Sequence, residues 1–532
     1  MNPDSLALLG LALGVVVLLG VALARRTGLP DPVVLVGVGL AASFLPGAPT
    51  ADLPPDLVFL VFLPPLVYRA SFLTSPQTLR ANAGALALLA VGLVVATAVA
   101  VALVVSWLVP GIGLAGGLVL GAVVAPTDPV ASAGVFSRLG APKRVVDLVE
   151  SESLINDATA LVLYAIAVEA VVSGPPSAAS ALGQLALAVL GGLAIGAAVA
   201  WVVARLRRRV SDVGLQLLLS LLTPYVSYVL ADHIGASGVL AVVATGVLLG
   251  ARAEGVFGAE ARLQSRAFWS LLDLLLNAVL FVLLGLEVRR VLAGTPRIGT
   301  GRLLLYAAAV VAVVVVVRVL WQFVVPPLAY LVRERLGSTS TRSSHAERLV
   351  LGWTGMRGAI SLAAALALPL EAGDHPFPER ALIVFLTVSV VLSTLVVQGL
   401  TLPLLLARLG LAGDGHEAND QAEQQTRLAL ADIALARLDE LEGAGEVTPA
   451  DVAPLRQIWE QARRRATPED NGTEGEVDLV WLRLELTRAQ SEELERRRSQ
   501  GEVPAEVARL LRQELDLQQV RLSSPGRAGT AT

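Results

Sequence analysis

The stretch Ala125-Pro126-Thr127-Asp128-Pro129 lies inside an apolar run, residues 112–137, that is long enough to cross a membrane. Its two prolines remove two backbone N–H donors and clash with the preceding turns, so a continuous helix is not expected. Non-helical backbone at membrane depth survives only where it faces protein or a water-filled cavity. We therefore predict an interrupted membrane helix with Asp128 at the start of its second half, where free N–H groups favour an anion. The alternative is a proline kink in which Asp128 only caps that half-helix.

A second interruption is predicted in the apolar run 346–370, which contains Gly352-Trp353-Thr354-Gly355-Met356-Arg357-Gly358. Glycine at every third position weakens a helix and lets another backbone approach closely. The two interrupted runs are the fifth and the twelfth, an odd offset, so they cross the membrane in opposite directions. Interrupted helices in corresponding positions of two oppositely oriented halves are typical of secondary transporters built from inverted repeats.

The composition supports a membrane protein. Of 532 residues 55% are hydrophobic and 16% are charged, whereas soluble domains have about 25% charged residues. The apolar runs that we interpret as membrane helices are 5–24, 31–46, 55–72, 83–108, 112–137, 145–173, 182–205, 213–231, 236–251, 267–288, 303–332, 346–370 and 380–409. We predict an all-α membrane protein with about 13 transmembrane helices. The first run is read as a retained span because no basic residue precedes it, unlike a signal peptide.

Charge divides the chain in two. Charged residues become frequent only after about Leu411, so we predict a transmembrane transporter domain at 1–411 and a helical cytoplasmic tail at 412–532, with helices at 421–442, 477–498 and 503–522. The simplest interpretation of the tail is a solvated helical segment that pairs with a second copy; ligand sensing is the alternative. No basic surface indicates nucleic-acid binding, and the absence of cysteine excludes disulfides and thiolate metal sites.

Arginine placement predicts the orientation in the membrane. Arginines follow the odd-numbered runs, whereas most loops after even-numbered runs carry none; the loop 289–302, with four arginines, breaks the alternation. Because basic loops remain in the cytoplasm, we predict a bacterial plasma-membrane protein with its N-terminus outside and its C-terminus in the cytoplasm.

Ionisable side chains inside membrane spans are costly, so they indicate function. In the sixth run Ser153 and Asp157 are four residues apart and share one helix face, while Glu152 and Asn156 share the adjacent face. Carboxylate, hydroxyl and amide oxygens suit an alkali cation better than a transition metal. A polar patch that only holds helices together is the structural alternative.

Arg357 lies near the middle of the twelfth run and needs a carboxylate partner. We predict Glu152 as that partner, because Asp128 and Asp157 are needed elsewhere. The expected role of Arg357 is structural: it holds the site together and compensates the ends of the half-helices.

Other function classes fit less well. The four histidines, at 233, 345, 375 and 416, lie in loops or at span ends, so a serine-type intramembrane protease is not supported. The Tyr-Asp and Gly-x-Gly-Asp contexts of aspartyl-type membrane proteases are also absent, and no Gly-x4-Gly-Lys loop suggests ATP-driven transport. A passive cation channel, which would pass ions without moving protons, is expected to form a symmetric pore around a filter. This chain is instead predicted to have an asymmetric buried site. We therefore predict a transporter that is not an enzyme and needs no cofactor.

The motifs Ala125-Pro126-Thr127-Asp128-Pro129, Glu152-Ser153-Leu154-Ile155-Asn156-Asp157 and Gly355-Met356-Arg357-Gly358 resemble those of bacterial sodium/proton antiporters of the monovalent cation:proton antiporter-1 family, over residues 5–411. The resemblance implies that Asp157 binds cation and proton alternately. It implies that Asp128, Ser153 and the Thr127 carbonyl complete the Na⁺ site, that Glu152 and Arg357 form an ion pair, and that Asn156 holds the broken helices.

The same resemblance implies electroneutral exchange of one cation for one proton, because Asn156 precedes Asp157 where other relatives have a second aspartate. It also implies a homodimer, with Na⁺ as the first substrate and K⁺ or Li⁺ as further ones. One departure affects selectivity: Arg69 lies where relatives often have an acidic residue, which makes K⁺ harder to exclude.

Overall fold

A computed structural model describes residues 3–27, 29–44, 55–74, 76–81, 83–174, 177–210, 212–252, 259–293, 299–335, 344–372 and 375–465, with short helical pieces between 486 and 500 and Leu511 and Leu515. Within these residues the fold is all-α, as predicted, apart from one hairpin of two short strands. The chain forms two compact units, Met1–Glu417 and Ala418–Thr532. The predicted boundary between membrane and tail domains, at 411/412, stays a prediction.

The first half of unit 1 contains these helices: α1 (Pro3–Thr27), α2 (Asp31–Ser43), α3 (Pro55–Leu73), α4 (Pro76–Ala81), α5 (Ala83–Leu86), the π-helical η1 (Ala87–Leu93), α6 (Val94–Leu108), α7 (Gly113–Val124), α8 (Val130–Leu139) and α9 (Lys143–Val172). The second half contains α10 (Ala178–Ala186), the π-helical η2 (Leu187–Gly191), α11 (Gly192–Arg207), α12 (Val213–His233), α13 (Gly238–Gly250), α15 (Ala259–Ala293), α16 (Thr300–Arg335), α17 (His345–Trp353), α18 (Ala359–Leu366) and α19 (Arg380–Arg408). Strand β1 (Glu371–Ala372) pairs antiparallel with β2 (His375–Pro376) before α19 begins.

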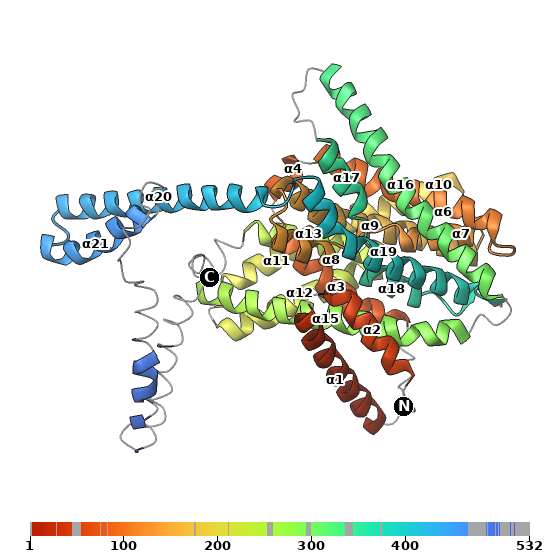
Figure 1. Ribbon diagram of the computed structural model, residues 1–532, viewed down its shortest axis with the longest axis horizontal. Helices are drawn as coiled ribbons and strands as arrows, with labels where there is room; N and C mark the ends of the chain where they lie inside the picture. Colours follow the sequence, from red (N-terminus) through yellow and green to blue (C-terminus); the bar gives the residue numbers. More distant parts are fainter. Residues whose placement is uncertain are drawn as a thin grey trace. The chain divides into compact units, whose positions relative to one another are not determined.

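Each predicted apolar run corresponds to one helix or to consecutive helical segments. Among the described residues, seven helical stretches are long and apolar enough to cross a membrane: Ala83–Leu108, Lys143–Val172, Leu182–Arg207, Val213–His233, Ala261–Leu286, Thr300–Leu328 and Arg380–Arg408. The exact number of crossings stays a prediction. The two predicted interruptions are present, between α7 and α8 and between α17 and α18 (Figure 1).

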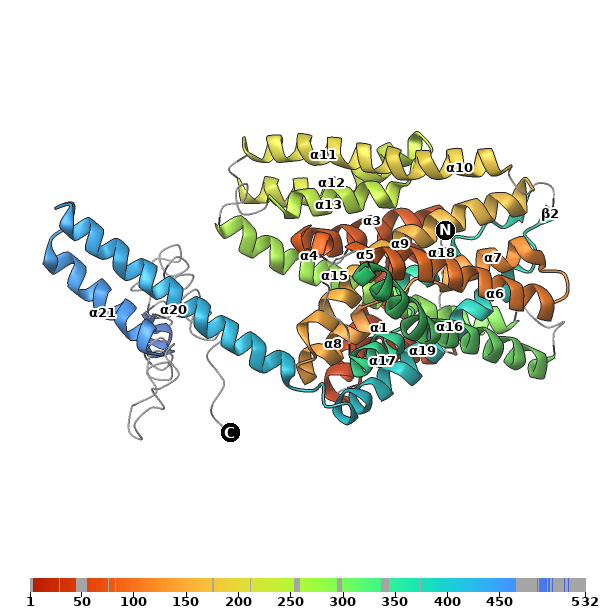
Figure 2. The same cartoon turned by 90° about the horizontal axis from the view of Figure 1, so that it is seen from above.

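Small residues allow the helices of unit 1 to pack closely. Gly117 and Gly121 of α7 lie against the backbone of α6, at Ala102 and Ala98, and a Cβ on either glycine would collide with that backbone. Helices α11, α12 and α13 lie side by side (Figure 2). Without a hydrophobic driving force in lipid, such close van der Waals packing is a main source of helix association.

The longer described helices of unit 2 form a pair. Its helices are α20 (Asp414–Gly443), which begins in unit 1, and α21 (Pro449–Arg465). Arg456 forms ion pairs with Asp439 at 2.6 Å and Glu442 at 2.7 Å, and Arg463 pairs with Asp432 at 3.0 Å. The predicted helix 421–442 lies within α20, α21 was not predicted, and the helices predicted at 477–498 and 503–522 lie largely outside the described residues.

Candidate functional site

The two helix interruptions contact each other. The backbone N–H of Asp128, in the break after α7, donates a hydrogen bond of 2.8 Å to the carbonyl of Met356, in the break after α17. The Asp128 carboxylate lies directly against Gly358, the residue before α18, and a Cβ at Gly358 would overlap it. Asp128 therefore lies at the positive end of the second broken helix, and Gly358 provides the space that this approach needs.

On the other side of the same break, the C-terminus of α17 is capped by an arginine of α16. Arg318 Nε donates to the carbonyl of Leu351 at 3.1 Å, and its Nη2 donates to that of Thr354 at 3.4 Å. Both carbonyls lie at the C-terminus of α17, which carries partial negative charge and lacks intrahelical donors. Gly355 leaves room for the Arg318 side chain, because a Cβ there would overlap its Cδ.

Arg318 also neutralises Glu152. Its Nη1 lies 2.5 Å from Glu152 Oε1 and its Nη2 lies 3.1 Å from Oε2. The two side chains are 2% and 1% exposed, so this is a buried bidentate ion pair.

This geometry corrects the predicted pairing of Glu152 with Arg357. The backbone N–H of Arg357 donates to Thr394 Oγ1 at 3.1 Å, and its side-chain Nε and Nη1 have no hydrogen-bond partner among the described residues. The pairing predicted from the sequence was wrong because helix periodicity does not determine which helix lies opposite Glu152. Arg318 is isolated between valines in the run 303–332, so it is also an intramembrane charge that needs a carboxylate partner.

The polar face of α9 holds the first interruption in place. Ser153 Oγ donates to the Thr127 carbonyl at 2.8 Å, and Asn156 Nδ2 donates to Thr127 Oγ1 at 2.8 Å. The Thr127 hydroxyl in turn donates to Glu152 Oε1 at 3.5 Å. Thr127, Glu152, Ser153 and Asn156 are thus joined in one buried network between α9 and the break.

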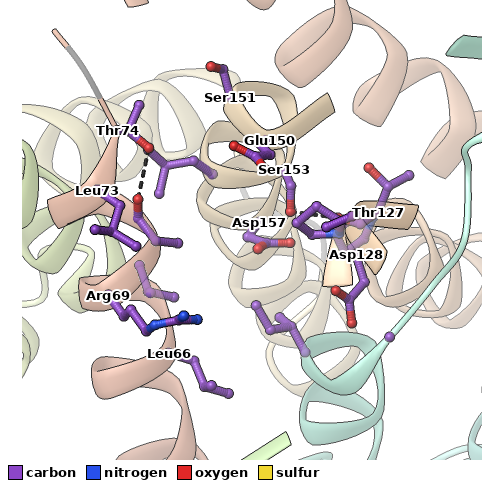
Figure 3. A pocket seen from close by; sticks show the side chains of 18 of the residues that line it. Leu66, Arg69, Leu73, Thr74, Thr127, Asp128, Glu150, Ser151, Ser153 and Asp157 are labelled. Atoms are coloured by element: carbon purple, nitrogen blue, oxygen red, sulfur yellow. Dashed lines mark hydrogen bonds between the residues drawn. The ribbon is translucent and has the colours of Figure 1, made fainter. Parts of the chain in front are cut away.

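A cavity of about 540 Å³ reaches this network (Figure 3). Its wall follows α9 from Lys143 to Asp157, a length of about 21 Å at ~1.5 Å per residue. The residues that line it on the other side come from α3, α15, α18 and the first interruption. Asp128, Ser153 and Asp157 all face it, and Ser361 of α18 lines it with a buried hydroxyl that has no partner among the described residues.

Asp157 differs from Glu152 in its contacts. It is 8% exposed, and within the described part of the chain no side chain or backbone group forms a hydrogen bond or ion pair with it. A buried carboxylate is costly unless it is paired, protonated or bound to a cation. Among the described residues, no side chain neutralises Asp157 as Arg318 neutralises Glu152.

A second ion pair faces the cavity from α3 and α15. Arg69 Nη1 lies 2.5 Å from Asp273 Oδ2, and the two side chains are 29% and 20% exposed. Figure 3 shows the Arg69 guanidinium directed into the cavity across from Asp157 and Asp128. Arg69 is the position at which the sequence departs from its relatives, and the sequence alone does not identify Asp273 as its partner.

The family model for the transmembrane part of sodium/hydrogen exchangers matches residues 14–408. The chain belongs to this family.

Similarity to individual members extends over most of this exchanger. It is 34% identical to an uncharacterized Na(+)/H(+) exchanger of Mycobacterium tuberculosis, over 97% of this chain and 96% of the relative. It is 29% identical to the sodium, potassium, lithium and rubidium/H(+) antiporter of Bacillus subtilis, over 94% of this chain and 76% of the relative. It is 31% identical to the low-affinity Na(+)/H(+) antiporter NhaS1 of Synechocystis, over 81% and 79%.

The fold of this exchanger is also found in a solved structure. The sodium proton antiporter MjNhaP1 of Methanocaldococcus jannaschii superposes with a TM-score of 0.59 at 19% identity, over 76% of this chain and 99% of MjNhaP1. As a sodium/hydrogen exchanger the chain is a multi-pass membrane protein for cation/proton antiport and belongs to a transporter family rather than to a family of catalytic enzymes. This confirms the predicted family and fold class.

Proposed function

We propose that this exchanger moves one Na⁺ against one proton, and that both compete for Asp157. The observation that carries the proposal is the contrast between two buried carboxylates on α9. Glu152 is fully neutralised by Arg318, whereas Asp157 has no partner in the described part of the protein and faces the cavity. Of these two carboxylates, Asp157 is the one available to bind either substrate.

The groups around Asp157 suit an alkali cation. The Ser153 hydroxyl and the Thr127 carbonyl oxygen are 2.8 Å apart, so one ion could contact both. Together with the carboxylates of Asp157 and Asp128 they supply only oxygen ligands, which hard cations prefer. Sodium would be held there as the transported substrate.

The surroundings favour a stoichiometry of one proton per cation. Asn156 cannot titrate, and its amide is used to hold Thr127. Asp128 lies against Gly358 at the N-terminal end of α18, where the partial positive charge of the helix attracts a carboxylate. With Glu152 held by Arg318, one group changes protonation state in each cycle.

Competition at one carboxylate also couples the two fluxes. A site loaded with either a proton or a cation is close to neutral and can cross the membrane dielectric, whereas the deprotonated site without a cation carries charge and cannot. The cavity reaches Asp157 from the N-terminal end of α9, which the arginine distribution assigns to the cytoplasm. This orientation and the homodimer stay predictions.

Potassium is the second substrate that we consider. The antiporter of Bacillus subtilis that resembles this chain is named for sodium, potassium, lithium and rubidium, so its name includes K⁺. Position 69 holds an arginine that faces the cavity, so the site could differ from a strictly Na⁺-selective one.

Purified protein in proteoliposomes tests the proposal directly. An internal pH dye would record proton movement after addition of NaCl, LiCl, KCl or choline chloride. We expect rapid proton counterflow with Na⁺ and Li⁺, slower flow with K⁺ and none with choline. Cation uptake without proton counterflow would show a passive channel, and no response to any alkali cation would overturn the proposal.

A further inference from the structure

We propose that the Arg69–Asp273 pair sets the affinity of the transport cavity for cations. Arg69 neutralises a carboxylate that would otherwise attract a cation into the cavity, and Asp273 neutralises a guanidinium that would otherwise repel it. This inference rests on the proposed function, because it concerns the same cavity. It adds two affinity-determining residues that do not need to touch the transported ion.

The Arg69–Asp273 pair lies in the wall of the transport cavity. Both side chains line the cavity that contains Asp128 and Asp157, and both remain partly exposed to it, at 29% and 20%. They come from different helices, α3 and α15, and contact each other at 2.5 Å. In Figure 3 the guanidinium of Arg69 points toward the side of the cavity where Asp157 lies.

The cavity is lined by more acidic than basic side chains. The other ionisable side chains that line it are Lys143, Asp147, Glu150, Asp128 and Asp157. Carboxylates therefore outnumber basic groups, and one of the two basic groups is committed to Asp273. Loss of either member of the pair would leave one uncompensated charge at the wall of the cavity. In a partly aqueous cavity, such a charge changes the electrostatic free energy of a cation bound at Asp157.

The two single substitutions consequently have opposite expected signs. Arg69→Gln exposes the Asp273 carboxylate and should lower the apparent KM for Na⁺, whereas Asp273→Asn exposes Arg69 and should raise it. We expect one uncompensated charge across a partly aqueous cavity to change the affinity for Na⁺ about two- to tenfold. The double variant Arg69→Gln/Asp273→Asn restores neutrality and should return close to wild type.

A purely structural role predicts a different pattern. If the pair only held α3 to α15, both single substitutions would impair transport in the same direction, and the double variant would not recover. Because partly exposed ion pairs contribute little to stability, the variants should remain folded. Arg456→Gln is a matched control, since it breaks an arginine–carboxylate pair in unit 2 and neither partner lines the cavity.

The experiment measures initial proton flux against Na⁺ concentration in proteoliposomes containing each full-length variant. Opposite shifts in KM for the single variants, recovery in the double variant and no shift for Arg456→Gln are expected. Shifts of the same sign, or no shift in either single variant, would overturn the inference while wild-type exchange leaves the proposed function standing. If Arg69→Gln does not fold, Arg69→Met alone and with Asp273→Asn provides the same comparison. A wild-type protein without Na⁺-dependent proton flux would instead overturn the proposed function.

Discussion

Removal of Arg318 should be among the most destabilising single changes at the broken helices. Arg318→Met leaves the Glu152 carboxylate, which is 1% exposed, without its ion-pair partner. It also leaves the carbonyls of Leu351 and Thr354 without their hydrogen-bond donor. Breaking a buried ion pair by removing one partner costs about 3–5 kcal/mol in soluble proteins. We expect a loss of at least that size in the free energy of unfolding, with reduced yield of folded protein.

The double variant Arg318→Met/Glu152→Gln should recover much of this loss, because no buried charge then lacks a partner. Arg357→Met is the matched control: the Nε and Nη1 of Arg357 have no hydrogen-bond partner among the described residues, so the substitution breaks no hydrogen bond at either atom. We expect Arg357→Met to cost less than about 1 kcal/mol, since unsatisfied buried donors contribute no stability.

Thermal unfolding followed by intrinsic fluorescence suits these comparisons, because the chain contains 7 tryptophans and no cysteine for thiol-reactive dyes. The coupling energy between positions 318 and 152 should exceed that between 357 and 152 by about 2 kcal/mol or more. Stronger coupling of Glu152 to Arg357 than to Arg318 would refute the reasoning and restore the pairing predicted from the sequence.

Three further predictions follow from the same geometry. Gly358→Ala should abolish transport, because its Cβ would overlap the Asp128 carboxylate, while Gly134→Ala, with nothing near its Cβ, should leave initial flux rates unchanged. Gly355→Ala should lower the unfolding temperature by displacing Arg318, and an unchanged melting curve would contradict this. Sodium-driven proton flux should not respond to an imposed potassium–valinomycin potential, after subtraction of the proton flux that the same potassium gradient drives without sodium. A clear voltage dependence would show that a second group, such as Asp128, also changes protonation state.

The sequence predicted the architecture well where composition alone determines it. Apolar runs of membrane length coincide with helices, and the prolines at 126 and 129 and the glycines at 355 and 358 marked the two interruptions. The spacing of Ser153, Asn156 and Asp157 on α9 also placed the polar face correctly, because a helix has a fixed periodicity.

Pairing between distant helices could not be predicted in the same way. Periodicity fixes which face a side chain lies on but not which helix is opposite, so Glu152 was assigned to an arginine within a recognised motif instead of Arg318. For the same reason Arg69 was noticed without its partner Asp273, which lies about 200 residues later in the sequence. Helix α21 was not predicted because the tail lacks the hydrophobic contrast that marks the membrane helices.

The central claim is that one carboxylate, Asp157, binds both substrates. Its most direct test is Na⁺-dependent proton flux by Asp157→Asn in proteoliposomes, measured beside Asp147→Asn, which removes a carboxylate from the same helix and the same cavity. Asparagine can neither release a proton nor neutralise a cation. We predict no exchange for Asp157→Asn in folded protein and retained exchange for Asp147→Asn. Sodium-dependent proton flux by Asp157→Asn above that of protein-free liposomes would contradict the claim.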